Sequence, residues 1–168
     1  MEQRIPMSGA FMREAAQTLP VEQSYDYHRT LKEGPVHRLW RDPAARSMPD
    51  EMAVPSEGWE LQIHAQSGPL VEFAADDLCE YLNTSMQVSV AVQRADSLDD
   101  WSARSGAIVA GTCEHMPGIG AELKGSKDYE IRVTPDQIVV CGYDDLGVMH
   151  GLFNVEARMS LREGPFLP

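Results

Sequence analysis

Two strand-like segments joined by a short turn, and the amphipathic helix that follows them, constrain the fold of this chain most strongly. Residues 128–134 alternate apolar and polar side chains, and after a turn at Pro135-Asp136 the apolar run at residues 137–141 returns as a second strand. Two such segments around a tight turn predict a β-hairpin. A helix is then expected to begin at Asp144, because a carboxylate can cap its exposed N–H groups, and to end at Gly164.

The segment before this hairpin adds further strands and helices. Residues 59–65 alternate and predict a half-buried strand, while residues 70–86 place apolar side chains along one side of a long helix. The β-branched run 88–92 and the apolar run 107–110 predict two more strands, with a short helix over Leu98–Arg104 between them. The order β-α-β-(α)-β-β-β-α predicts an α+β fold, in which two main helices pack on a mixed β-sheet of about five strands.

Residues 1–58 differ in composition from the rest of the chain. They hold six of the eleven prolines and show little sustained periodicity. Proline disfavours helix interiors, so we expect only short helical pieces here, at Phe11–Gln17 and Thr30–Trp40. The sequence predicts a proline-rich arm over residues 1–58, which lies on its own domain, on a neighbouring domain or on another copy of the chain. Residues 59–168 are predicted to form the α+β domain.

The chain is strongly acidic. It has 14 Lys+Arg against 26 Asp+Glu, which gives a formal net charge of −12 over 168 residues. Such a charge repels phosphate groups, so neither nucleic acid nor an anionic membrane surface is an expected partner. High solubility explains the charge most simply, and nothing else in the sequence supports a site for cationic ligands.

The cysteines and the first residues bear on the cellular compartment. The chain has three cysteines, at Cys79, Cys113 and Cys141. A small and odd number of cysteines does not make a disulfide framework. Cys79 and Cys141 fall on apolar patterns and are predicted to lie in the core. The N-terminus lacks an apolar leader, and no run approaches the roughly 20 apolar residues that span a bilayer. We therefore expect reduced thiols and a cytoplasmic location, whereas the oligomeric state stays open.

The sequence predicts no cofactor, metal or catalytic residues. It has no HExxH motif, and Cys113 with His115 offers only two ligands in one loop, whereas a structural zinc site needs four. Gly118-Ile119-Gly120 matches only the beginning of a dinucleotide-binding loop and predicts a turn. Three acidic pairs are expected to occupy solvated faces or helix caps, because adjacent carboxylates do not face each other across a sugar as a glycosidase pair does. These pairs are Asp76/Asp77, Asp99/Asp100 and Asp144/Asp145.

Two glycines lie four residues apart in the last predicted helix. Gly147 and Gly151 each cost about 1 kcal/mol relative to alanine in a helix, so a packing benefit is expected. We expect this helix to approach the sheet closely at both positions. A membrane GxxxG contact is excluded because the same segment carries charged side chains.

The final stretch resembles a known signature. Residues 129–133 have the pattern Y-x-I-x-V, and residues 138–151 have the pattern I-x-V-x-G-x-D-x-x-G-x-x-x-G. Upstream, residues 108–111 supply an I-x-x-G element after an amphipathic helix. Together these elements resemble the N-terminal domain of certain glycoside hydrolases, namely β-N-acetylhexosaminidases, α-glucuronidases and bacterial hyaluronidase-like or O-GlcNAc-removing enzymes. The resemblance covers about residues 59–162.

This resemblance implies a zincin-like fold without the catalytic centre. It also implies a non-catalytic accessory domain in a larger glycoside hydrolase, whose catalytic acids lie in a following (β/α)₈ barrel. The barrel is thus the implied partner, the chain is expected to be a fragment, and no catalytic residue carries over to it.

Two alternatives remain beside that interpretation. The first is a stand-alone carbohydrate- or protein-binding module, in which tryptophans supply stacking surfaces for a glycan, although core packing explains them more simply. The tryptophans are Trp40, Trp59 and Trp101. The second alternative is an independent enzyme, which requires a pocket with convergent polar groups.

Overall fold

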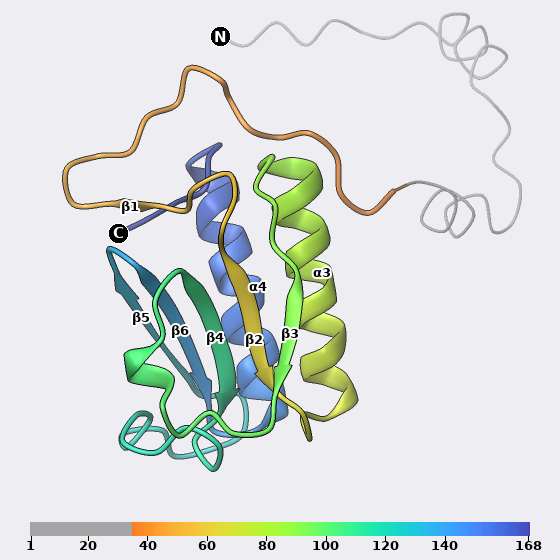
Figure 1. Ribbon diagram of the computed structural model, residues 1–168. Helices are drawn as coiled ribbons and strands as arrows, with labels where there is room; N and C mark the ends of the chain where they lie inside the picture. Colours follow the sequence, from red (N-terminus) through yellow and green to blue (C-terminus); the bar gives the residue numbers. More distant parts are fainter. Residues whose placement is uncertain (1–34) are drawn as a thin grey trace, which may run out of the picture. The chain divides into compact units, whose positions relative to one another are not determined.

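A five-stranded mixed β-sheet organises the fold (Figure 1). The computed structural model describes residues 35–168. The strands follow the order β3-β2-β4-β6-β5, and within this sheet every neighbouring pair is parallel except β5 with β6. Their bounds are β2 (Glu60–His64), β3 (Val92–Ala95), β4 (Ala107–Thr112), β5 (Tyr129–Thr134) and β6 (Gln137–Gly142).

Two long helices cover one face of the sheet (Figure 1). Helix α3 (Pro69–Ser85) begins with a proline, whose fixed φ suits the first helical turn. Helix α4 (Asp145–Leu161) begins after Asp144, whose side chain accepts a hydrogen bond of 2.8 Å from the N–H of Gly147. The predicted cap is therefore confirmed, and so is the predicted α+β class with two main helices on a mixed sheet.

The opposite face of the sheet has its own smaller core. The 3₁₀ turn η1 (Trp101–Ala103) lies over this face, with side chains of the loop at residues 113–128. Because side chains alternate along a strand, β4 and β6 contribute to both cores. In β4, for example, Ile108 packs toward the helices while Val109 packs toward the loop.

The glycines of α4 bring the helix against the hairpin, as predicted. A Cβ on Gly147 would lie 2.3 Å from the backbone oxygen of Asp128, and a Cβ on Gly151 would lie 2.4 Å from Cγ1 of Val140. Both distances are far below ordinary van der Waals contact, so a larger residue would displace helix or sheet. The expected close approach of α4 to the sheet is therefore confirmed.

The sequence misplaced one strand and overstated one helix. The predicted strand at 88–92 is wrong in position, because the observed strand β3 begins only at Val92. The N–H of Val88 instead donates to the oxygen of Leu82 in α3, and the N–H of Ser89 donates to the oxygen of Ser56. The short helix expected over Leu98–Arg104 is only the 3₁₀ turn η1.

The segment from His37 to residue 58 packs with the sheet domain in one compact unit, residues 37–168. Within it, β1 (Met52–Ala53) pairs antiparallel with β7 (Phe166–Leu167). The indole N–H of Trp40 donates to the oxygen of Ser160 near the end of α4, at 2.9 Å. These bonds attach the proline-rich segment to the C-terminal part of the domain.

Two earlier expectations concern the first residues. The predicted helix Phe11–Gln17 lies outside the described residues, and the described end of the predicted piece Thr30–Trp40, residues 35–40, is not helical. Among residues 35–168, no helix has the length and apolar character needed to cross a membrane.

Candidate functional site

A cleft with a volume of about 470 Å³ opens at the carboxyl ends of β4 and β6, beside the first turns of both long helices. It is lined by Leu70, Thr112, Glu114, His115, Ser126, Tyr143, Asp144, Asp145 and Leu146. A second hollow, of about 250 Å³, lies between the β1 segment and the β5–β6 turn. The larger cleft is the better candidate, because it gathers more side chains that hydrogen-bond or titrate.

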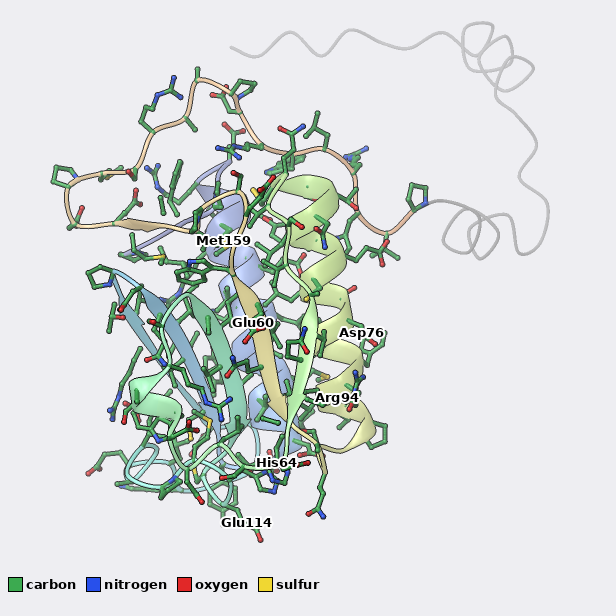
Figure 2. The ribbon with its side chains drawn as sticks, in the orientation of Figure 1. Glu60, His64, Asp76, Arg94, Glu114 and Met159 are labelled. Carbon is green, nitrogen blue, oxygen red and sulfur yellow. The ribbon has the colours of Figure 1, made fainter. Side chains whose placement is uncertain are left out.

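The topology of the sheet explains why polar groups gather at this end. The chain passes from β2 through α3 to β3 on one side of β2, and then returns to place β4 on the other side. Ligands of open α/β sheets bind where the order of strands reverses in this way, outside the carboxyl ends of the strands. Figure 2 shows His64 and Glu114 at this end of the sheet, opposite Met159.

Two histidines from neighbouring strands stack on each other beside the cleft. His64 is the last residue of β2, and His115 follows β4. Their ring centroids are 3.9 Å apart and their planes differ by 8°. Nδ1 of His64 accepts a hydrogen bond of 3.1 Å from the N–H of Gln66, while Nδ1 of His115 lies 3.3 Å from Oγ1 of Thr112. Both rings are thus held in place by packing and by hydrogen bonds to residues near them in sequence.

The arrangement of His115 differs from that of a nucleophile–base–acid triad. Its hydroxyl partner Thr112 is three residues away in the same turn. A triad needs a third group, usually a carboxylate, that orients the imidazole through a hydrogen bond. In the described part of the chain, His115 is flanked by the ring of His64 and receives no such bond.

The acidic residues of the cleft serve the starts of the helices. Asp144 caps α4, and hydrogen bonds from the Ser126 side chain and the Gly147 N–H hold the pKa of Asp144 below its usual range. Asp145 fills the space beside Gly68, where an added Cβ would lie only 2.0 Å from its Oδ2. Gly68 precedes α3 and gives that helix no side-chain cap, so the Asp145 carboxylate complements the positive end of the helix dipole.

The other acidic pairs of the sequence lie outside the cleft. Asp100 forms an ion pair with Arg104 four residues later, which agrees with a solvated role. Asp76 is exposed, as expected. Asp77 contradicts the expectation of a solvated face, because its side chain is only 16% exposed and lies 3.0 Å from Nε2 of His37. The partner comes from the proline-rich segment, 40 residues away.

Cys113 and His115 do not converge as a pair of metal ligands. The Sγ of Cys113 lies 3.5 Å from the Sγ of Cys141 and also contacts the oxygen of Gly142, whereas the His115 ring stacks on His64. Cys79 and Cys141 are buried, as predicted. The predicted turn at Gly118-Ile119-Gly120 is confirmed, since both of its glycines adopt positive φ.

The three tryptophans do not form a common stacking surface. Trp59 lies in the main core, and Trp101 packs on the second core under the guanidinium of Arg132. Trp40 is 46% exposed, but its indole N–H is bound to Ser160. Core and surface packing thus account for these residues, and the exposed aromatic ring of the cleft is instead that of Tyr143.

The stacking of His64 on His115 was not predicted from the sequence. A signal was present, because His64 lies at the end of one predicted strand and His115 follows another. Predicting the contact also required knowing that these two strands are neighbours in the sheet, and the order of strands is not encoded in local patterns.

No protein-family model and no curated protein sequence matches this chain. One solved structure that resembles it is a family GH115 4-O-methyl-alpha-glucuronidase with specificity for decorated arabinogalactans. It is 19% identical with a TM-score of 0.49, and the match covers 64% of this chain and 14% of that chain. A GH138 enzyme targeting pectin rhamnogalacturonan II is 13% identical with a TM-score of 0.43, over 65% of this chain and 15% of that chain. This chain therefore spans a small share of either glycoside hydrolase.

Proposed function

We propose that this chain is a non-catalytic accessory domain of a larger glycoside hydrolase and packs against a following (β/α)₈ catalytic barrel. In this proposal residues 59–168 are the domain proper, and residues 1–58 are an arm attached to it. The three cysteines, which form no disulfide in the described structure, support a reducing, cytoplasmic location.

One observation carries the proposal: the residues of the signature serve packing and capping. The Y-x-I-x-V element forms β5, and the rest of the signature forms β6 and α4. Its glycines lie where a side chain would collide with backbone or core atoms, as Gly142, Gly147 and Gly151 each do within 2.4 Å. Its aspartate, Asp144, caps α4. A pattern of this kind specifies how hairpin and helix fit together, which suits a structural module.

The test compares the proposed barrel alone with the same barrel joined to this chain. The coding sequence after Pro168 is determined first, and an eight-fold alternation of strands and helices is expected. The barrel is then expressed with and without residues 1–168. We expect the thermal unfolding midpoint of the barrel to be higher when the accessory domain is attached, because burial of the shared interface stabilises both parts.

Glycosidase activity of the chain alone would contradict the proposal. Incubated with a panel of chromogenic glycosides, it is expected to release no more chromophore than a His115→Asn variant. Hydrolysis that disappears in His115→Asn would identify the cleft as an active site and would overturn the non-catalytic role.

A second candidate function, a stand-alone carbohydrate-binding module, is favoured by the composition of the cleft. Tyr143 is 49% exposed and Leu70 is 44% exposed at its edge, beside the polar groups of Thr112, Glu114 and Ser126. An aromatic face next to hydroxyl and carboxylate groups suits a sugar, which has apolar faces and polar edges. Calorimetric titration with a broad set of glycans tests this idea. Binding that is lost in Tyr143→Ala but kept in Phe73→Ala, an exposed ring outside the cleft, would support the module.

A further inference from the structure

A second group of titratable side chains lies outside the cleft, where the proline-rich segment meets both long helices. His37 comes from that segment, Asp77 from α3 and Glu156 from α4. Each offers one ligand atom, and all three atoms lie within 4.8 Å of one another. Three elements far apart in the sequence thus converge on one point.

The imidazole of this group is held firmly. His37 is only 8% exposed, and its ring meets the ring of Tyr81 edge to face, with centroids 5.5 Å apart and planes at 72°. The hydroxyl of Tyr81 is in turn 2.8 Å from Oγ of Ser160 in α4. Packing on Tyr81 therefore fixes the direction in which Nε2 points, toward Oδ1 of Asp77 at 3.0 Å.

The negative charges of this group favour the binding of a cation. Two carboxylates face each other, and in the described part of the chain neither forms an ion pair with lysine or arginine. A positive ion between the carboxylates would relieve both the repulsion and the cost of burial.

We propose that His37, Asp77 and Glu156 bind a zinc ion that attaches the proline-rich segment to α3 and α4. One imidazole nitrogen with two carboxylate oxygens suits a borderline-soft ion such as Zn²⁺ better than Mg²⁺ or Ca²⁺, which prefer oxygen alone. Zinc takes these ligands at about 2.0–2.2 Å, so tetrahedral ligands lie about 3.4 Å apart. The three ligand atoms lie within 4.8 Å of one another, and in this proposal a water molecule takes the fourth position. The ion would join three elements of the chain, and its water-occupied fourth position makes the site open, unlike a structural site closed by four protein ligands. None of the three residues lines either of the two hollows described above.

The proposal is tested by titrating the full chain, treated first with a chelator, with Zn²⁺ alone in a calorimeter. We expect one equivalent to bind and to raise the thermal unfolding midpoint. Asp77→Asn and Glu156→Gln are expected to weaken the affinity by at least about tenfold and to remove the thermal shift. Asp76→Asn, which neutralises the exposed neighbour of Asp77, serves as the matched control and should bind like the unmodified chain.

Two further measurements distinguish loss of zinc binding at this site from loss of folding and from zinc binding at the cleft. Thermal unfolding without zinc checks that each variant is folded, so that lost affinity is not lost structure. His115→Gln removes the imidazole of the cleft and should leave zinc binding unchanged. Absence of stoichiometric binding, affinity retained in both Asp77→Asn and Glu156→Gln, or affinity lost in His115→Gln would each overturn the proposal.

Discussion

Replacing Gly151 by alanine tests how closely α4 is held against the hairpin. The new Cβ would lie 2.4 Å from Cγ1 of Val140, about 1 Å inside ordinary van der Waals contact. Val140 is fully buried and β-branched, so its side chain cannot rotate away cheaply. Because the contact is as short as 2.4 Å, overpacking here belongs in the upper part of its usual range and costs about 2–3 kcal/mol, while the better helix propensity of alanine returns about 1 kcal/mol. We expect the free energy of unfolding to fall by about 1–2 kcal/mol, and Tm to fall by about 2–4 °C for each kcal/mol.

A double-mutant cycle with Val140→Ala shows whether this contact is the cause. Val140→Ala alone removes buried methyl groups and costs about 1–3 kcal/mol. In the double variant the Cβ of residue 151 enters the vacated space, so we expect a favourable coupling of about 1 kcal/mol. Urea unfolding followed by circular dichroism measures all four proteins. Gly125→Ala, whose Cβ would meet no atom within 4 Å, is the control. A Gly151→Ala variant as stable as the original chain, or strictly additive effects in the cycle, would refute the reasoning.

Two other predictions concern a helix cap and the thiols. Asp144→Ala should destabilise the protein by about 1 kcal/mol at pH 7, whereas Asp144→Asn, which keeps a capping oxygen, should cost less. Because the folded-state pKa of Asp144 is lowered, the stability that its charge contributes is present above the unfolded-state pKa of about 3.9 and is lost as pH falls through the folded value. Urea unfolding from pH 7 to pH 3 should therefore show the advantage of the unmodified chain over Asp144→Asn shrinking below about pH 4; an advantage that grows in acid would contradict this. Among the thiols, Cys113 should react first with an alkylating reagent at pH 8, because Cys141 is fully buried and burial raises the pKa of the Cys79 thiol to about 12. Mass spectrometry of peptides identifies the labelled residue, and early labelling of Cys79 would count against the described core.

Sequence patterns predicted those elements of the fold that are determined by residues close together in the chain. The hairpin of β5 and β6, the Asp144 cap and the glycine face of α4 all follow from residues close together in sequence, and the structure contains them. Strand β3 was misplaced for a physical reason. The apolar run 88–92 does contribute buried side chains, yet the backbone at Val88 pairs with the end of α3 and enters the sheet only later.

The polar clusters depended on contacts that no local pattern encodes. His64 and His115 meet only because β2 and β4 are neighbours, and the sequence specifies each strand without specifying their order. Asp77 was expected on a solvated face because it belongs to the polar side of α3. The segment that carries His37 covers that position, and its proline-rich sequence does not indicate where it lies.

The pairing of β1 with β7 also determines how this domain responds to mechanical load. Met52 lies opposite Leu167 and Ala53 lies opposite Phe166. The N-terminal end of β1 and the C-terminal end of β7 therefore lie at the same end of the two-stranded ladder. Tension applied at these ends separates the pairs one after another, instead of shearing all of them at once, because the hydrogen bonds run perpendicular to antiparallel strands. Stretching would thus peel β1 from β7 at low force, while the five-stranded sheet behind them stays intact.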